Sequence, residues 1–454
     1  MSIQSLNPAT EEVVASFNPL SEGDLQNVLN STAESWTGWK SKSFSERAGL
    51  LKKAADQLRA QSEELAEIMA VEMGKPIRMG KEEALKCAAV CDYYADEGES
   101  MLAPIPVEGV GRKAFVTFEP LGTVLTVMPW NFPFWQVFRI AAPSLMAGNT
   151  VVLKHASNVP QCALAIEKIF VDAGFPANVF RTLLIGASQV ETVLDHKSVF
   201  AVSLTGSAAA GRKVASAAGA RLKKSVMELG GSDPLVVLAD ADIEEAVKVA
   251  TKSRCRNTGQ TCISAKRFIV MDEVYDEFVS GLTKRMSRLV MGDPFDPKTD
   301  MGPMSSGRLR AELQEQVDRC VEAGGKILIG GSIPKRTGYY YPPTIITDIS
   351  PSADVCKEEL FGPVALVFRV HSVDEAVAVA NDTPFGLGGS VWSKDEDAAA
   401  KVAARIRTGC VYINSLVRSN MHLPFGGTGI SGYGRELGSY GIREFVNVKP
   451  VCIG

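Results

Sequence analysis

Apolar residues recur at helical spacing in the first part of the chain. Between Phe44 and Met73 they occupy positions 51, 54, 58, 65, 68 and 69, which fall on one face of a helix. The pattern therefore predicts an amphipathic helix over residues 44–73. We expect it to end at Gly74, because a glycine followed closely by Pro76 is a common helix stop.

From about residue 122 the pattern changes to short apolar runs that alternate with helical stretches. The runs have the length of buried strands and lie at residues 123–128, 150–154, 182–186, 201–206 and 234–239. Helical patterns separate them at residues 159–174, 188–196 and 207–219. Strands that alternate with helices predict βαβ units, so we expect a doubly wound parallel sheet.

A second α/β series begins at residue 267. Strand patterns at residues 267–271, 365–370 and 411–414 are separated by helical patterns at 274–290, 307–324, 372–382 and 395–406. Residues 443–454 alternate like an exposed strand that pairs with another element or another subunit. There is no internal repeat and no low-complexity linker, so we expect interleaved domains.

Composition narrows the function classes. The chain has 454 residues, which is long enough for two or three domains. Its formal net charge of −4 provides no positive field for binding nucleic acid. No apolar run approaches the roughly 18 residues of a membrane span, and the N-terminus lacks a signal-peptide pattern. We therefore expect a cytoplasmic protein that binds neither nucleic acid nor membrane.

Cysteines and histidines do not form a metal-binding pattern. The nine cysteines are odd in number and contain no CxxC pair, and the four histidines are dispersed. Cys87 and Cys91 would share a helix face and are typical of buried small apolar residues. We expect neither a metal site nor a disulfide framework.

Two glycine-rich stretches suggest nucleotide binding. Gly206 and Gly211 lie between a strand and a helix, where free backbone N–H groups favour a phosphate, although a closely packed helix would use the same glycines. The stretch nearly matches a P-loop, but Arg212 replaces the lysine and no Ser or Thr follows it. "GTGISG", residues 427–432, is expected to be a flexible loop, because too few residues follow it for a dinucleotide-binding unit.

Three polar residues in otherwise apolar stretches are candidates for catalysis. Cys262 is either a nucleophile or an inert thiol, since no histidine lies near it in sequence. Glu228 follows an apolar run, where burial would raise its pKa and make it a base near neutral pH. Asn131 lies between aromatic residues and prolines after a strand, where its amide N–H can stabilise an oxyanion.

Together these stretches resemble the NAD(P)-dependent aldehyde dehydrogenase family. "PWNFP", "LTGSAAAG", "ELGG", "NTGQTC" and "EELFGP" stand in the family's order and spacing, and the resemblance covers essentially the whole chain. Within the family the chain is most similar to the short bacterial succinate-semialdehyde dehydrogenases, as "MPWNFPFWQVFR" and "LKHASNVPQCA" indicate.

The resemblance implies a role for each catalytic candidate. Cys262 would attack the aldehyde to give a thiohemiacetal, and hydride transfer to the nicotinamide would leave a thioester. Asn131 and the backbone N–H of Cys262 would form the oxyanion hole. Glu228 would activate the water that hydrolyses the thioester, and the positive charge of the cofactor would favour the Cys262 thiolate.

The resemblance also implies an atypical Rossmann coenzyme domain. Its cofactor-binding residues would be Trp130 and Lys154 on the adenosine side, Gly206 and Ser207 at the pyrophosphate, and Glu359 and Phe361 at the nicotinamide ribose. NAD-preferring relatives carry a glutamate three residues after the lysine, where this chain has Ser157. Without that carboxylate a 2′-phosphate is not repelled, so we expect NADP to be preferred and NAD to be a poorer substitute.

A substrate with a remote carboxylate requires a cationic or hydrogen-bonding site. The resemblance implies that Arg139, Arg256 and Ser419 bind this carboxylate, with Trp135 on the same helix face as Arg139. Arg418 is a competing candidate. The expected reaction is oxidation of succinic semialdehyde to succinate. Glutarate semialdehyde and uncharged aldehydes are alternative substrates, and a P-loop nucleotide-binding protein or a non-catalytic structural relative is an alternative of another class.

The family's organisation predicts the domains. Residues 1–108 and 128–228 would form the coenzyme-binding domain and residues 229–432 the catalytic domain. Residues 109–127 and 433–454 would form a small β-flap that joins subunits into a homo-oligomer, a dimer or a dimer of dimers.

Overall fold

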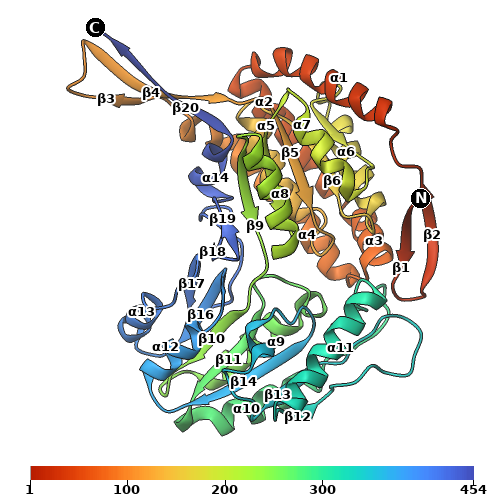
Figure 1. The fold of residues 1–454 in the computed structure, drawn as a ribbon, viewed down its shortest axis with the longest axis vertical. Coiled ribbons are helices and arrows are strands. Elements are labelled where there is room, and N and C mark those ends of the chain that lie inside the picture. Colours follow the sequence, from red (N-terminus) through yellow and green to blue (C-terminus); the bar gives the residue numbers. More distant parts are fainter. Residues whose placement is uncertain (1) are drawn as a thin grey trace.

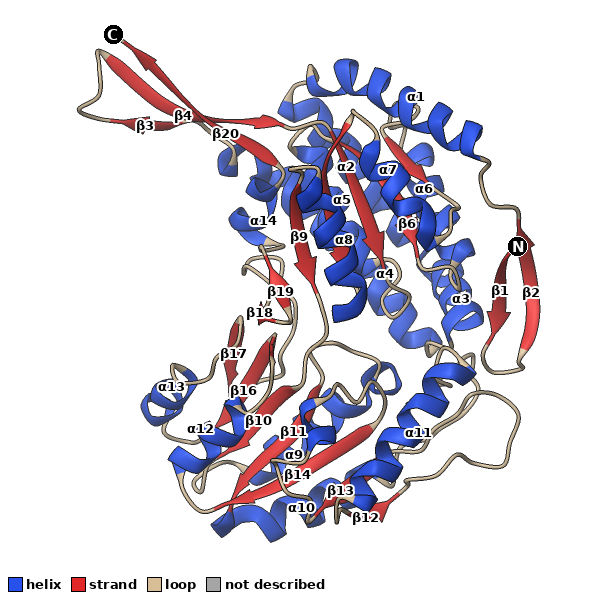
Figure 2. Cartoon of the chain, in the orientation of Figure 1, coloured by secondary structure: helices blue, strands red, loops and turns tan. Residues whose placement is uncertain are grey.

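Two large, mostly parallel sheets result from the alternation of apolar runs with helices (Figures 1 and 2). The computed structural model describes residues 2–454. The predicted α/β class is confirmed, with six strands in one sheet and seven in the other. No helix among the described residues is both long and apolar enough to cross a membrane.

The six-stranded sheet has the order β19-β9-β8-β5-β6-β7, and only β19 is antiparallel to its neighbour. Its strands are β5 (Thr123–Met128), β6 (Thr150–His155), β7 (Phe180–Thr182), β8 (Val199–Thr205), β9 (Lys224–Glu228) and β19 (Gly432–Tyr433). One face packs on α2 to α6 and the other on α1, α7 and α8. These helices are α1 (Glu22–Lys40), α2 (Phe44–Ala60), α3 (Ser62–Met73), α4 (Ile77–Met101), α5 (Trp135–Met146), α6 (Pro160–Asp172), α7 (Val190–Asp195) and α8 (Ala208–Ala220).

The seven-stranded sheet has the order β12-β13-β14-β11-β10-β16-β17, with β12 antiparallel at one edge. Its strands are β10 (Asp233–Val237), β11 (Ala265–Met271), β12 (Lys326–Ile329), β13 (Thr344–Thr347), β14 (Val364–Val370), β16 (Gly388–Trp392) and β17 (Cys410–Ile413). Helices cover both faces, α9 and α10 on one and α11, α12 and α13 on the other. They are α9 (Ile243–Cys255), α10 (Asp272–Met286), α11 (Gly307–Glu322), α12 (Val373–Asn381) and α13 (Glu396–Ala403).

A three-stranded antiparallel arm projects from the body (Figure 1). It consists of β3 (Ile105–Val107), β4 (Lys113–Pro120) and β20 (Val446–Ile453), so the C-terminal strand pairs within its own chain. Residues 123–127, which the predicted flap included, instead form most of β5 in the six-stranded sheet. Their side chains are mostly buried, and burial on both faces suits a central parallel strand.

Two other element predictions need correction. The helix predicted over residues 44–73 ends at Gly74 as expected, but it breaks at Gln61 into α2 and α3. The break lets the apolar faces of both segments pack on α4. The strand predicted at 182–186 lies earlier, as β7. Its register with β6 ends at Thr182, and the Leu183 N–H makes one further bond to β6, at the Leu153 carbonyl.

Two ribbons and a short helix complete the fold. They are β1 (Ile3–Asn7) with β2 (Glu12–Phe17), β15 (Phe385–Gly386) with β18 (Thr428–Gly429), and α14 (Gly438–Glu444). The chain passes from one large sheet to the other directly after β9. The candidate catalytic residues therefore lie where the two sheets meet: at the end of β9, between β5 and α5, and before β11.

Candidate active site

The loop that carries Cys262 has an unusual backbone. Asn257, Thr258 and Gly259 all have positive φ, at 53°, 56° and 73°. A Cβ on Gly259 would lie 2.3 Å from the carbonyl carbon of Gly362, so only glycine fits there. The buried Arg254 guanidinium donates to the Gly259 carbonyl at 2.6 Å and holds this strained segment in place.

Cys262 and Glu228, which are 34 positions apart in sequence, are brought together. The Cys262 Sγ lies 3.9 Å from Oε2 of Glu228; the Cys262 residue is half-buried and Glu228 is fully buried. Burial, and then the charge of Glu228, raises the pKa of the Cys262 thiol well above its ordinary value. In this arrangement the thiol is protonated, so an additional positive charge or a base is needed to generate the thiolate.

Glu228 has the properties of a base near neutral pH. Burial raises its pKa to about 8, and the nearby Arg139 guanidinium opposes this rise. Among the described residues its Oε1 has no hydrogen-bond partner although it is buried. An unpartnered buried carboxylate oxygen is available to accept a proton from the thiol or from a water molecule.

A buried lysine organises the other side of the cysteine. Lys266 Nζ donates to the Cys262 carbonyl at 2.6 Å and to the Thr261 carbonyl at 3.0 Å, and it lies 3.4 Å from Oε1 of Glu359. Glu359 also accepts the N–H of Gly231 at 3.1 Å. A Cβ on Gly231 would lie 2.9 Å from the Cys262 carbonyl oxygen. This close approach explains why the last position of the "ELGG" stretch is a glycine.

The side chain of Asn131 is held by hydrogen bonds on every polar group except one N–H of Nδ2. Its Oδ1 accepts from Gln136 Nε2 at 3.0 Å, and its Nδ2 donates to the Gln260 carbonyl at 3.0 Å. The second hydrogen on Nδ2 has no partner among the described residues. A fixed amide with one free N–H is suited to stabilise an oxyanion.

A buried ion pair that sequence reasoning missed supports this asparagine. Lys75 and Glu83 pair with each other, and Lys75 Nζ also donates to the Asn131 carbonyl at 2.9 Å. Glu83 Oε1 accepts the N–H groups of Phe134 and Trp135, each at 3.0 Å, at the start of α5. The "GKP" sequence at residues 74–76 was the only available signal, and it indicated only a helix end.

Arg139 is less available to a substrate than the sequence suggested. Its buried guanidinium forms ion pairs with Glu228, at 3.2 Å, and with Glu436, and it donates to Thr205 at 3.1 Å. Two carboxylates therefore already compensate its charge. Glu436 was not among the predicted site residues, because it lies more than 200 positions from Glu228 in the sequence.

Arg139 and the other predicted substrate residues line one pocket with Cys262. Trp135 Nε1 donates to the Ser419 hydroxyl at 2.8 Å, and Arg256 lies over the ring of Phe132, 5.5 Å from its centroid. Arg418 is exposed at the rim of the same pocket. Lys86 of α4 also lines the pocket and was missed, because a helical pattern does not show which lysine faces a cavity.

The predicted cofactor residues lie at the carboxyl ends of the six-stranded sheet and on the facing loop. Lys154, the penultimate residue of β6, has a mostly buried side chain and no carboxylate partner among the described residues, and Ser157 beyond the strand is exposed. Ser207 caps α8 and leaves that helix's first turn exposed. Trp130 and Phe361 meet edge to face with their centroids 5.9 Å apart. A lysine without a carboxylate partner and the exposed start of a helix are suited to bind the phosphates of a dinucleotide, and the aromatic pair belongs to the same group of predicted residues.

The other glycine-rich signals have structural explanations. A Cβ on Gly211 would lie 2.5 Å from the Leu229 side chain, so this glycine permits close packing of α8 on the sheet. The stretch 427–432 is held against "ELGG", where Ser431 donates to the Gly230 carbonyl at 2.6 Å. A Cβ on Gly432 would lie 2.0 Å from the Met227 carbonyl oxygen, so this loop is packed in place.

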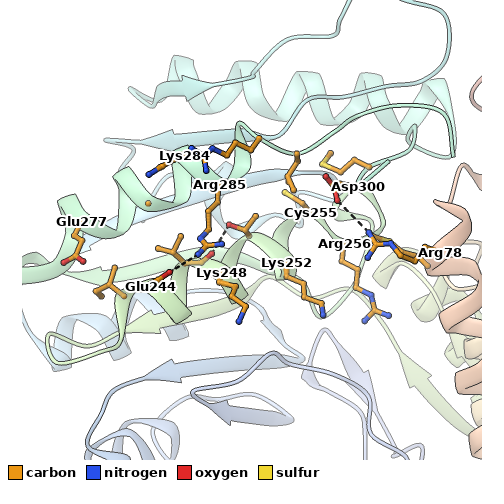
Figure 3. Close-up of a pocket in the computed structure, with 18 of the residues that line it drawn as sticks. Arg78, Glu244, Lys248, Lys252, Cys255, Arg256, Glu277, Lys284, Arg285 and Asp300 are labelled. Atoms are coloured by element: carbon orange, nitrogen blue, oxygen red, sulfur yellow. Dashed lines mark hydrogen bonds and ion pairs between the residues drawn. The ribbon is translucent and has the colours of Figure 1, made fainter. Parts of the chain in front are cut away.

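A larger surface hollow, about 800 Å³, lies elsewhere, between α9, α10 and the start of α4 (Figure 3). Arg78 and Asp300 pair at its edge at 3.8 Å, and Cys255 lines it. None of Cys262, Glu228 and Asn131 borders it. Cys255 and Cys262 are both free thiols. The chemistry is therefore assigned to the smaller pocket at Cys262.

Comparisons with known proteins agree with this geometry. The model of the aldehyde dehydrogenase family matches residues 1–451. A succinate-semialdehyde dehydrogenase [NADP(+)] from Mycobacterium leprae is 46% identical over 456 residues, covering all of both chains. A solved structure of Gox0499, described for its cofactor and substrate selection, is 43% identical with a TM-score of 0.99 and full coverage of both chains. The succinic semialdehyde dehydrogenase of Streptococcus pyogenes in complex with NADP+ is 39% identical with a TM-score of 0.97, covering 99% of each chain.

Proposed function

The chain belongs to the aldehyde dehydrogenase family, and from this premise we propose that it oxidises succinic semialdehyde to succinate with NADP as the preferred hydride acceptor. The observation that carries the chemistry is the placement of the Cys262 thiol 3.9 Å from the buried Glu228 carboxylate, beside a fixed asparagine amide. The full-length relatives that act on this substrate with NADP support the choice of aldehyde and cofactor.

The proposed reaction uses the chain's own residues in two stages. The positive charge of the cofactor, when bound, would favour loss of the thiol proton to solvent, and the Cys262 sulfur attacks the aldehyde carbon to form a thiohemiacetal. The free Asn131 N–H and the Cys262 backbone N–H stabilise the negative oxygen. Bound NADP accepts the hydride, which leaves an acyl thioester on Cys262. Glu228 then takes a proton from water, whose oxygen attacks the thioester and releases the carboxylic acid and the thiol.

For the cofactor, we assign the adenosine 2′-phosphate to Lys154 and Ser157. Burial lowers the pKa of Lys154, and a bound phosphate would stabilise its charged form. The start of α8, at Gly206 and Ser207, would hold the pyrophosphate. Trp130 would lie on the adenosine side with Lys154. On the nicotinamide side, the residues of the site are Phe361 and Glu359, the latter of which Lys266 fixes.

For the substrate, we assign the remote carboxylate to the polar end of the pocket. Ser419 and Arg256 line it, and Trp135 positions the Ser419 hydroxyl. Arg139 also lines the pocket, but its ion pair with Glu228 would make it act mainly on the charge of that carboxylate.

We also propose the domain division and assembly of the family. Residues 1–104 with 123–228, which include β5, form the coenzyme domain and 229–432 the catalytic domain, while the arm of β3, β4 and β20 joins subunits of a homo-oligomer. Relatives of bacterial origin support a cytoplasmic location.

The test follows the absorbance of reduced nicotinamide with purified protein, succinic semialdehyde and either NADP or NAD. We expect reduction with NADP, slower reduction with NAD, and none in Cys262→Ala. Faster turnover with NAD would contradict the Ser157 assignment alone. Activity only on uncharged aldehydes would contradict the substrate assignment.

A further inference from the structure

Two buried cations near Cys262 are already paired with carboxylates, and this determines which cations remain for a substrate. Arg139 is paired with Glu228 and Glu436. Lys75 is paired with Glu83. A carboxylate that entered the pocket would gain little from either of these compensated cations.

Lys86 is a cation of the pocket that has no carboxylate partner among residues 2–454. It lies on α4 one turn after Glu83, and its Nζ donates to the Ser419 hydroxyl at 2.9 Å. The ammonium also lies over the Trp135 ring, 3.7 Å from its centroid. An ammonium has three donors, and the described residues accept only one of them.

The same contacts orient the Ser419 hydroxyl. Its oxygen accepts from both Lys86 Nζ at 2.9 Å and Trp135 Nε1 at 2.8 Å. No described residue accepts the hydroxyl hydrogen. Lys86 and Ser419 therefore present adjacent donors to the pocket, and adjacent donors match the two oxygens of a carboxylate.

We propose that Lys86 is a specificity-determining residue, whose ammonium binds the remote carboxylate of a short ω-carboxy aldehyde together with the Ser419 hydroxyl. The inference deepens the proposed function and rests on it. It adds a lysine of α4 to Arg256 as a further pocket cation that pairs with no carboxylate in the described part of the chain, while Arg139 pairs with Glu228.

The surroundings of Lys86 make this binding depend on pH. The groups that face it are Glu83 and Cys87 on its own helix, Arg139 on α5, Arg256 before the catalytic loop, and Arg418 at the rim. Burial, and then the charges of Arg256 and Arg139, lowers the pKa of Lys86 to about 7. Only the protonated amine pairs with a carboxylate, so KM for an acid aldehyde should rise as the pH rises above about 7.

The test compares two aldehydes of similar shape. Succinic semialdehyde carries the carboxylate, and 4-methylpentanal replaces it with an uncharged isopropyl group. In Lys86→Met we expect KM for succinic semialdehyde to rise about 10- to 100-fold, the loss of one charged hydrogen bond. KM for 4-methylpentanal should stay within about threefold of wild type, since the substitution keeps the apolar stem. The rise of KM with pH should also disappear.

Controls separate charge from packing. Lys86→Arg should keep most of the preference for the acid because it keeps the charge. Lys81→Met is the matched control, because Lys81 lies on the same helix but pairs with Glu63 at the surface, and its kinetics should equal wild type.

Two different results would identify which assignment failed. If the wild-type enzyme oxidised 4-methylpentanal with the same kcat/KM as succinic semialdehyde, that result would contradict the proposed function itself. A wild-type preference for the acid that persists unchanged in Lys86→Met, or equal changes of KM for both aldehydes, would overturn the role of Lys86 alone.

Discussion

At the scale of single residues, the reactivity of Cys262 depends on a buried group of three charges. Glu228, Arg139 and Glu436 are each at most 2% exposed, and the guanidinium lies between the two carboxylates. Burial raises the pKa of both glutamates, and Arg139 opposes the rise. The balance keeps Glu228 able to change protonation state near neutral pH, as a residue that accepts and releases protons must.

The first prediction concerns the pH dependence of thioester hydrolysis. Only the carboxylate form of Glu228 accepts a proton, so hydrolysis should accelerate with pH through its pKa of about 8. Glu228→Gln should be slower by about 10²- to 10⁴-fold and should lose this dependence. Multiple-turnover stopped-flow measures both, and an unchanged profile in the variant would show that another base operates.

The second prediction concerns Arg139→Gln. Both glutamates have pKa values raised above their ordinary value, so the stability they contribute is lost as the pH rises towards their folded-state pKa. In Arg139→Gln, which lacks the guanidinium, the free energy of unfolding should fall further, by about 3–5 kcal/mol relative to wild type, at pH values where both carboxylates would ionise. Thermal unfolding at several pH values measures it. A difference from wild type that does not grow with pH would contradict the shared charge compensation.

At the scale of elements, the site depends on loops that are fixed by buried groups from distant segments. Arg254 fixes the strained turn before Cys262, Lys266 fixes the cysteine carbonyl, and the Lys75–Glu83 pair fixes the loop of Asn131. These contacts hold three loops in one arrangement, as catalysis requires.

The third prediction tests the tight turn at Gly259. Gly259→Ala places a Cβ against the backbone of Gly362 at positive φ, so we expect activity to fall at least about 100-fold and the melting temperature to drop. Gly219→Ala is the control, because its helical position in α8 has no atom within 4 Å of the new Cβ, and it should be stabilising by about 0.5–1 kcal/mol. Full activity in Gly259→Ala would show that the turn is not required.

Sequence patterns predicted elements well where local periodicity decides the structure. The strand at 123–128 has the predicted bounds, and the strands β6, β8, β10 and β14 lie within two residues of theirs. The break at Gln61 was not predicted, because packing on α4 causes it rather than a proline or glycine. Lys86, Glu436 and the Lys75–Glu83 pair were missed for the same reason: their roles depend on contacts between distant segments, which one sequence does not show.

At the scale of the whole molecule, the arm requires an explanation outside the single chain. Its three strands extend away from both sheets (Figure 2), and apolar side chains on it are exposed. They are Ile105, Val107, Val110, Val448 and Ile453. A thin sheet with exposed apolar residues and open edges is marginal alone, which supports the proposed contact with another subunit.

The fourth prediction tests this contact. Val448→Lys with Ile453→Lys adds two charges to the arm, and light scattering after size exclusion should show a smaller assembly than wild type. Val171→Lys is the control, because Val171 is 61% exposed on α6, away from the arm, and should leave the assembly unchanged. A double variant with the wild-type mass would contradict the role of the arm.

The most direct test of the whole account is the mass of the Glu228→Gln variant, quenched after mixing with succinic semialdehyde and NADP and then digested. We predict one succinyl group, held as a thioester on the peptide that contains Cys262, because acylation proceeds and hydrolysis is slow. No adduct, or an acyl group on another cysteine, would contradict the assignment of Cys262 as the nucleophile and Glu228 as the base.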